Sequence, residues 1–259
     1  SSGLGKVFCQ KLANEGYSIT GVARSTNKLE NITKQLGDGH RYIQADLTRQ
    51  SELKKVINEI NQEHYNLLIN SAGYGIHGEF NEFYIKDYEK MMFLNMNVLV
   101  QLTHQFLLNA LEGDAIINVS SALSEIPFPG GAVYSGTKSF VTNFTEALWY
   151  ENKKRNIYLL SLLPGLTKTN FQKVSGNNKY DLTNSHADPP EVVVNEALKE
   201  LKKRESPVLV SSPKYRILLR MAKKLLSKKQ LMSIIANFSP AMKQNRPIKN
   251  RSQKNEYSN

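Results

Sequence analysis

The chain has 259 residues, 40% of them hydrophobic, which is enough for one globular domain with a substantial core. Its net charge of +11 resembles that of a nucleic-acid-binding protein, but residues 1–212 hold 22 basic and 22 acidic residues, so the whole excess lies in residues 213–259. The single cysteine, Cys9, excludes an intramolecular disulfide, and no secretory signal or apolar run of the ~20 residues that span a bilayer is visible, so we expect a cytoplasmic protein.

Short apolar or β-branched runs alternate with stretches of helical period as far as about residue 210. The stretches of helical period, such as 49–63 after an expected Thr48 cap, are long enough for crossover helices. Strands joined by such crossovers must be parallel, so the pattern predicts a doubly wound parallel sheet, the α/β Rossmann fold, in a single domain over residues 1–212. The expected strands are 17–23, 41–45, 66–70, 115–119, 157–162 and 207–210.

The sequence opens on Ser1-Ser2-Gly3-Leu4-Gly5, a glycine-rich turn that leads into a stretch of helical period. A turn of this kind binds phosphate when a strand delivers the chain to the N-terminus of a helix. No strand precedes the turn here, so we expect the domain to be N-terminally truncated and its first, central strand to be missing. The loss of a central strand leaves two strand edges exposed.

Tyr134 and Lys138 are four residues apart in the stretch 132–151, so they share one face of the expected helix. An ammonium group beside a phenol favours the phenolate, which is expected to lower the pKa of Tyr134 and to make it an acid/base group near neutral pH. Ser121, at the end of the preceding expected strand, is placed to donate a hydrogen bond to a substrate oxygen. An isolated Tyr-x-x-x-Lys pair is also typical of a solvated helix face, so its meaning depends on the motifs around it.

Five motifs in order make residues 1 to about 212 resemble the classical short-chain dehydrogenase/reductase (SDR) family. The matching segments are Gly3 and Gly5 of the glycine turn, Asn70-Ser71-Ala72-Gly73 in place of the family's Asn-Asn-Ala-Gly, Asn97, Ser121 placed 13 residues before Tyr134, and Pro164-Gly165-Leu166-Thr167-Lys168-Thr169.

This resemblance implies an oxidoreductase that transfers a hydride between a nicotinamide and a carbonyl or alcohol, without a metal. It implies that Tyr134 transfers the proton, Lys138 lowers the pKa of Tyr134 and binds the nicotinamide ribose, Ser121 orients the substrate oxygen, and Asn97 holds a water of the proton relay. The positions that match the family's cofactor contacts are Ser2, Gly3, Leu4, Gly5, Asp46, Leu47, Asn70, Ala72, Gly73, Tyr134, Lys138, Pro164, Gly165, Thr167 and Thr169.

The end of the 17–23 strand indicates the cofactor. An acidic residue at this place would bind the ribose hydroxyls of NAD and repel a phosphate. The chain instead has Arg24 and Ser25, a guanidinium and a hydroxyl that suit a 2′-phosphate, so we expect NADP(H) to be preferred over NAD(H).

The region after residue 212 is predicted to be a basic amphipathic helical extension over 213–242, followed by a disordered tail over 243–259. Its apolar residues, Ile217, Leu218, Met221, Leu225 and Leu226, recur at helical spacing. Three interpretations stay open: a lid or flank packed on the catalytic body, a helix on an anionic membrane surface, and a nucleic-acid contact. The last is disfavoured because aromatic residues for base stacking are few, so we expect no nucleic-acid partner.

The substrate cannot be identified from the sequence beyond a small carbonyl or alcohol compound with some apolar character. The loops expected around it, 74–83, 123–131 and 171–190, supply Phe80, Phe83, Ile126, Phe128 and Phe171. The resemblance also implies a homodimer or homotetramer formed through the helices expected at 84–111 and 132–151. The alternative function is a non-catalytic NADP-binding protein, which is disfavoured because Asn97, Ser121, Tyr134 and Lys138 are all present, and isomerisation or dehydration on the same scaffold is a further alternative.

Overall fold

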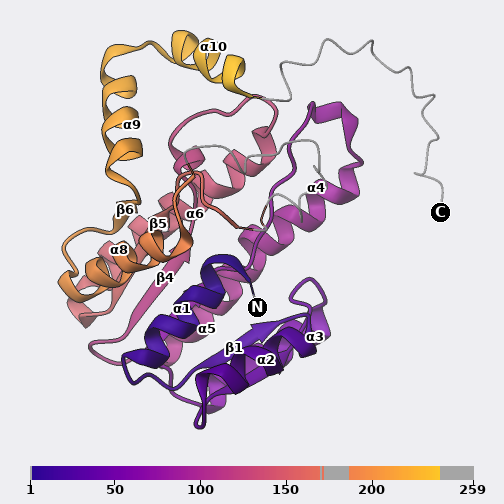
Figure 1. Ribbon diagram of the computed structural model, residues 1–259, viewed down its shortest axis with the longest axis vertical. Helices are drawn as coiled ribbons and strands as arrows, with labels where there is room; N and C mark the ends of the chain where they lie inside the picture. Colours follow the sequence, from indigo (N-terminus) through magenta and orange to yellow (C-terminus); the bar gives the residue numbers. More distant parts are fainter. Residues whose placement is uncertain (1, 170, 172–186, 240–259) are drawn as a thin grey trace.

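Parallel strands carry the structure, and helices cover both of their faces (Figure 1). The computed structural model describes residues 2–169, 171 and 187–239. The strands are β1 (Thr20–Ala23), β2 (Arg41–Gln44), β3 (Leu67–Asn70), β4 (Ala115–Val119), β5 (Tyr158–Leu163) and β6 (Val208–Val210). The main helices are α1 (Gly3–Asn14), α2 (Thr26–Leu36), α3 (Gln50–Gln62), α4 (Ile85–Met92), α5 (Leu99–Asn109), α6 (Ala132–Glu151), α8 (Pro190–Lys203), α9 (Pro213–Leu225) and α10 (Lys228–Phe238).

The predicted parallel, doubly wound arrangement is confirmed. Within the described residues, β1 pairs with β2, and β3, β4, β5 and β6 form a second sheet in that order, all in parallel. Among the described strands, β1, β2, β3 and β6 each pair on one side only, and β1 and β3 are linked at their starts, where Tyr65 just before β3 donates a hydrogen bond of 3.2 Å to Thr20 of β1. The missing first strand expected from the sequence stays a prediction.

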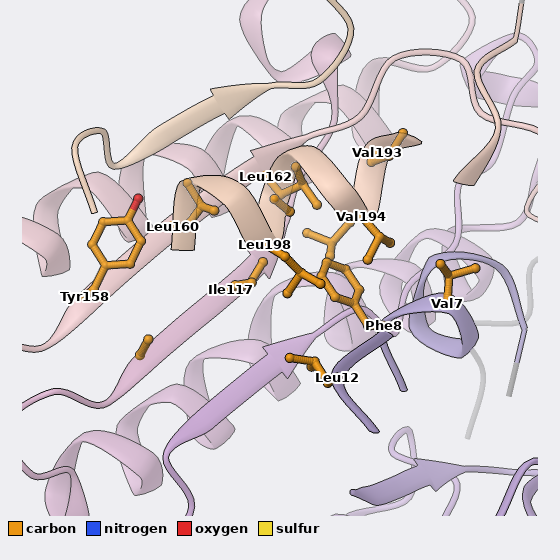
Figure 2. Close-up of a cluster of buried hydrophobic side chains, with 13 residues drawn as sticks. Val7, Phe8, Leu12, Ile117, Tyr158, Leu160, Leu162, Val193, Val194 and Leu198 are labelled. Carbon is orange, nitrogen blue, oxygen red and sulfur yellow. The ribbon is translucent and has the colours of Figure 1, made fainter. Parts of the chain in front are cut away.

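The alternation of side chains along β4 and β5 divides the core into two halves. On one face, Ile117 and Leu162 pack against Phe8 of α1 and against Val194 and Leu198 of α8, as Figure 2 shows. On the other face, β4 and β5 pack against α3 and α5. Because the interior strands are covered on both sides, β5 is buried along its whole length, which fixes the strand ends as a rigid platform for a site.

Two local expectations were wrong. Strand β1 begins at Thr20 rather than at residue 17, because the backbone N–H of Tyr17 closes the end of α1 on Leu12 and its side chain is exposed. Thr48 does not cap α3: the cap position is Arg49, and the Thr48 hydroxyl instead donates a 2.7 Å hydrogen bond to Asp46.

The single helix expected over 84–111 is interrupted. Between α4 and α5, residues Phe93–Val98 form a π-helical turn. A wider turn changes which residues face inward, and such insertions often occur at functional sites. Here Asn95 becomes buried and Asn97 exposed.

Helices α9 and α10 extend away from the sheet, α9 rising from β6 and α10 turning across its end (Figure 1). Both lie within the extension predicted over 213–242, whereas the tail predicted over 243–259 lies outside the described residues. Among the helices that the structure describes, none is long and apolar enough to cross a membrane.

Candidate active site

The residues singled out by sequence gather at one edge of the molecule because parallel strands end at the same side of a sheet. Arg24 follows β1, Asp46 follows β2, the segment from Ser71 follows β3, Ser121 follows β4 and Pro164 follows β5. The carboxyl ends of the strands therefore define the candidate site.

Ser121, Tyr134 and Lys138 are brought together and are almost completely buried, with exposed fractions of 8%, 6% and 5%. The hydroxyl of Tyr134 shares a hydrogen bond with the side chain of Ser121. The Nζ atom of Lys138 lies 5.9 Å from the centre of the Tyr134 ring and donates a 2.8 Å hydrogen bond to the backbone carbonyl of Val119, the last residue of β4. Helix α6 thus presents the tyrosine and the lysine on one face, as the four-residue spacing predicted.

Burial dominates the acid–base properties of this pair. It raises the pKa of Tyr134 to about 12, although the hydrogen bond with Ser121 acts in the opposite direction. It also lowers the pKa of Lys138 to about 8. Burial and the hydrogen bond with Ser121 account for the pKa shift of Tyr134, so the expectation that Lys138 lowers this pKa stays a prediction.

Asn95, rather than Asn97, takes part in this cluster. The Asn95 side chain donates hydrogen bonds to the Tyr74 carbonyl at 2.9 Å and to the Thr137 hydroxyl at 3.1 Å, and it accepts one from the Tyr74 N–H at 3.2 Å. It thereby joins the segment after β3 to helix α6, whereas Asn97 points away as an exposed residue of the π turn. The sequence alone misses Asn95, because Asn95 and Asn97 are two residues apart and only the rotation of the helix decides which of them faces inward.

Gly73 lies where this asparagine meets the lysine. A Cβ atom at Gly73 would lie 2.9 Å from Asn95 Oδ1 and 3.6 Å from Lys138 Nζ, so only glycine leaves this space open. The preceding residue of the motif, Ala72, is exposed.

Aromatic rings surround the Tyr134 side chain. The ring of His77 lies 5.4 Å from it in an edge arrangement, and the ring of Phe171 lies 5.7 Å from it. Phe128 contacts His77 in turn, at 6.0 Å. Burial lowers the pKa of His77, so its imidazole is neutral at neutral pH.

A cavity of about 250 Å³ adjoins this aromatic group. Ile76 and Val133, which flank the site, line it together with Phe80 and Tyr88. Of the loop side chains expected to supply an apolar pocket, Phe128 and Phe171 lie in the ring group around Tyr134, and Phe80 borders the cavity with 62% of its surface exposed. Residues 172–186 of the third expected loop lie outside the described part of the chain.

The N-terminus of α1 has the features that a phosphate group requires. Gly3 adopts a φ of 53°, Ser2 at the cap position makes no side-chain hydrogen bond to the helix, and the first turn contains no acidic residue. Thr169 approaches this turn, since a Cβ atom at Gly3 would lie 3.4 Å from its side chain. Leu4 packs against the core cluster between α1 and α8, and Gly5 approaches Ser71.

The end of β1 also suits a phosphate. Arg24 is exposed, Ser25 stands at the cap of α2 without a side-chain hydrogen bond to the helix, and the first turn of α2 has no acidic residue. Asp46 lies nearby; burial raises its pKa, but hydrogen bonds from Thr48 and the positive charge of Arg24 hold the net pKa below its usual value. The residues present therefore fit a nucleotide carrying an additional phosphate.

Two positions assigned by resemblance to cofactor contacts have their side chains elsewhere. Leu47 packs into the core between β2 and α3, with 9% of its surface exposed. Asn70 donates hydrogen bonds to Thr103 and to Asn118, which continues to Thr145, so its side chain belongs to a buried polar chain between β3, β4 and the helices.

The segment after β5 closes the site. The carbonyl of Pro164 accepts a 2.9 Å hydrogen bond from Ala122, next to Ser121, and Thr167 donates to the carbonyl of Gly165. The ring of Tyr215 from α9 covers Gly165, where a Cβ atom would lie 2.3 Å from it. Among the described residues, no group of three or more His, Cys, Asp or Glu side chains is arranged to hold a metal ion.

A parallel sheet with a glycine-led helix at its phosphate end and a buried serine, tyrosine and lysine at its strand ends defines a class, the nucleotide-binding α/β proteins of the doubly wound type. Residues 1–179 match the model of the short chain dehydrogenase family. The chain belongs to the short-chain dehydrogenase/reductase family.

Relatives of known name cover about two thirds of the chain. The serine 3-dehydrogenase of Rhizobium radiobacter is 29% identical over 69% of this chain and 74% of its own. The very-long-chain 3-oxoacyl-CoA reductase of Mus musculus is 28% identical over 67% of this chain and 59% of its own. Among solved structures, a short-chain dehydrogenase from Sphingobium yanoikuyae in complex with NADPH is similar, with a TM-score of 0.78, 27% identity and coverage of 90% of this chain and 92% of that chain.

Proposed function

We propose that this chain is an NADP(H)-dependent oxidoreductase that transfers a hydride between the nicotinamide and a carbonyl or alcohol substrate, with Tyr134 as the proton-transferring group. The observation that carries this proposal is the buried tyrosine, hydrogen-bonded to Ser121 and flanked by the ammonium of Lys138, at the carboxyl ends of the strands.

In carbonyl reduction, each residue of the site has a separate role. NADPH, when bound, supplies the hydride that adds to the carbonyl carbon. Tyr134 donates its phenolic proton to the carbonyl oxygen, which becomes the hydroxyl of the alcohol product. Ser121 holds that oxygen by a hydrogen bond, and Lys138 places a positive charge beside the phenolate that remains. Oxidation of an alcohol reverses each of these transfers.

Asn95 takes the supporting place that the resemblance gave to Asn97. Its three hydrogen bonds hold the Tyr74 backbone against helix α6, beside Gly73 and the ammonium of Lys138. We propose that it is a positioning residue, which fixes the segment after β3 relative to Lys138 and so keeps open the space at Gly73.

NADP(H) is preferred in this proposal because Arg24 and Ser25 stand at the end of β1, where no carboxylate in the first turn of α2 opposes a phosphate. The NADPH complex of the Sphingobium relative supports the same choice. The α1 N-terminus, with Gly3 and Gly5, would hold the pyrophosphate, and the segment from Pro164 to Thr169 would lie against the nicotinamide.

The substrate in this proposal is a carbonyl or alcohol compound with an apolar group beside the reacting carbon. The rings of His77, Phe128 and Phe171 around Tyr134 support this. The names of the relatives range from serine to a very-long-chain 3-oxoacyl-CoA, so the choice rests on the residues around Tyr134.

Helices α5 and α6 support a homo-oligomer, a dimer or a tetramer. Leu108 on α5 is 64% exposed, Phe140 on α6 is 39% exposed and stacks on Phe144 at 5.6 Å, and Tyr150 is 72% exposed. A second copy that covers these side chains would remove apolar surface from water. Sedimentation of the protein and of Phe140→Asp tests this, since the variant is expected to be monomeric.

The function is tested by following NADPH oxidation by the full-length protein with a panel of apolar ketones and aldehydes. Tyr134→Phe is expected to lower kcat by about 10²- to 10⁴-fold. Tyr150→Phe, an exposed tyrosine of the same helix, is the matched control and is expected to keep full activity. Tight NADPH binding without turnover of any substrate would overturn the proposal in favour of a non-catalytic NADP-binding protein.

A further inference from the structure

Helix α9 carries a stripe of apolar side chains that face solvent. Ile217, Leu218, Met221 and Leu225 are 59%, 62%, 54% and 69% exposed. Their spacing places them on one side of the helix. Contiguous exposure of four large apolar residues on a single helix marks an interaction surface rather than scattered surface residues.

The opposite side of α9 is anchored to the catalytic body. The ring of Tyr215 covers Gly165 and its hydroxyl is hydrogen-bonded to the backbone of Leu166. Arg216 donates a 3.0 Å hydrogen bond to the carbonyl of Val210 and pairs with Glu196 at 3.5 Å. The first turn is therefore fixed to the body, and the rest of α9 extends away from it (Figure 1). The apolar stripe on this helix is exposed.

The second helix of this extension continues the same surface chemistry. Helix α10 begins at a capping box formed by Ser227 and Gln230, so it is a defined helix rather than a frayed end. Met232 and Ile234 on it are 39% and 42% exposed. We call residues 213–239, which comprise α9 and α10, the basic arm.

The charge of the basic arm indicates which kind of partner it binds. It contains seven lysines and arginines and no acidic residue, whereas residues 1–212 are balanced. A second copy of the arm would bring two strongly positive surfaces together, which opposes self-pairing. A nucleic acid would satisfy the charge but would leave the apolar stripe in water. An anionic lipid surface accommodates both features, because its headgroups attract the lysines and arginines and its hydrocarbon region buries the apolar stripe.

We propose that the basic arm lies on an anionic membrane surface, with Ile217, Leu218, Met221 and Leu225 inserted and with Arg220 and Lys224 at the lipid headgroups. Tyr215 couples the arm to the site, because its ring rests on Gly165 in the segment after β5. Docking through the arm therefore holds the candidate active site next to the bilayer. This proposal does not rest on the hydride-transfer activity, since its evidence is the exposed apolar stripe and the charge of the basic arm.

Co-sedimentation of the full-length protein with vesicles tests it. Vesicles of phosphatidylcholine mixed with phosphatidylserine are expected to carry the protein down, and pure phosphatidylcholine vesicles are not. Arg220→Gln with Lys224→Gln is expected to lower the partition coefficient about 25-fold, since each basic residue near an anionic surface contributes about fivefold. Leu218→Asn with Leu225→Asn is expected to lower it about tenfold or more.

Matched controls lie elsewhere on the surface. Lys54→Gln with Lys55→Gln removes two exposed charges from α3, and Ile85→Asn with Leu111→Asn removes two apolar side chains that are 46% and 61% exposed. Both controls are expected to bind vesicles like the unchanged protein. Equal sedimentation with neutral vesicles, or equal loss in the arm variants and the controls, would overturn the proposal. It would also be overturned by an arm-dependent dimer or nucleic-acid complex formed without vesicle binding.

Discussion

Replacement of Asn95 by alanine is expected to destabilise the protein strongly, whereas the same change at Asn97 is not. The Asn95 side chain is 1% exposed and makes three hydrogen bonds, two of them with the backbone of Tyr74. Its loss leaves the Tyr74 N–H and carbonyl without these partners, at about 1–3 kcal/mol for each buried polar group. We therefore expect Asn95→Ala to lower the free energy of unfolding by about 2–5 kcal/mol.

Asn97 provides the matched control. It is exposed and lies in the same π-helical turn, so Asn97→Ala is expected to change the free energy of unfolding by less than about 0.5 kcal/mol. Urea unfolding followed by far-ultraviolet circular dichroism measures both variants, with the m-value as a check on two-state behaviour. The same pair separates their roles in catalysis, because Asn95→Ala is expected to lower kcat and Asn97→Ala to leave it unchanged. Equal destabilisation by the two substitutions, or a larger loss of activity in Asn97→Ala, would refute the assignment.

Three further predictions concern single side chains of the site. Lys138→Met is expected to raise the free energy of unfolding at pH 7 by about 1–3 kcal/mol. Burial lowers the pKa of Lys138 from 10.5 to about 8, so the folded protein disfavours the charged form that the variant lacks. The loss of the hydrogen bond to Val119 offsets part of this gain. Since the folded pKa lies below the unfolded value, stability of the unchanged protein rises between pH 8 and pH 10.5, and the advantage of the variant should shrink over that window in urea titrations; an advantage that grows with pH would contradict the reasoning. Arg24→Ala is expected to weaken NADPH binding roughly 10- to 100-fold and to leave NADH binding unchanged in fluorescence titrations, and equal weakening of both would show that Arg24 does not bind the 2′-phosphate. His77→Phe is expected to keep kcat at pH 7 within about tenfold, because burial keeps the imidazole neutral and its ring packs on Tyr134, and a larger loss would instead make His77 a proton-transferring group.

Much of the fold could be predicted because its signals are local. The alternation of apolar runs with helical stretches located all six described strands, and β4 was predicted to the residue. The starts of strands were less predictable: Tyr17 has high strand propensity, but its backbone N–H closes helix α1. Propensity describes a residue, whereas this hydrogen bond depends on where the helix ends.

The site was predicted where it depends on spacing and missed where it depends on helix phase or burial. A four-residue spacing placed Tyr134 and Lys138 on one face of α6. The π-helical turn rotates Asn95 inward, and a regular helical period in the sequence does not reveal such a turn. The raised pKa of Tyr134 likewise follows from neighbours such as His77 and Phe171, which come from distant segments.

In the extension after residue 212, the helix could also be predicted from spacing, whereas its contacts with the body could not. Helical spacing predicted an amphipathic α9 but left open whether its apolar side packs on the body. The structure shows that Tyr215 and Arg216 make the contacts with the body, while Leu218 and Leu225 remain exposed. The first turn of α9 thus contacts the body as a lid or flank would, whereas the apolar stripe does not pack on the body.

The central claim is that a hydride passes directly from NADPH to the carbon of a carbonyl substrate. The most direct measurement uses NADPH carrying deuterium at one or the other prochiral position of C4, with mass spectrometry of the product. The account predicts one deuterium on the carbinol carbon from one of the two labelled cofactors and none from the other, with the signal lost in Tyr134→Phe. A product without deuterium from either cofactor, or one formed without NADPH consumption, would contradict it.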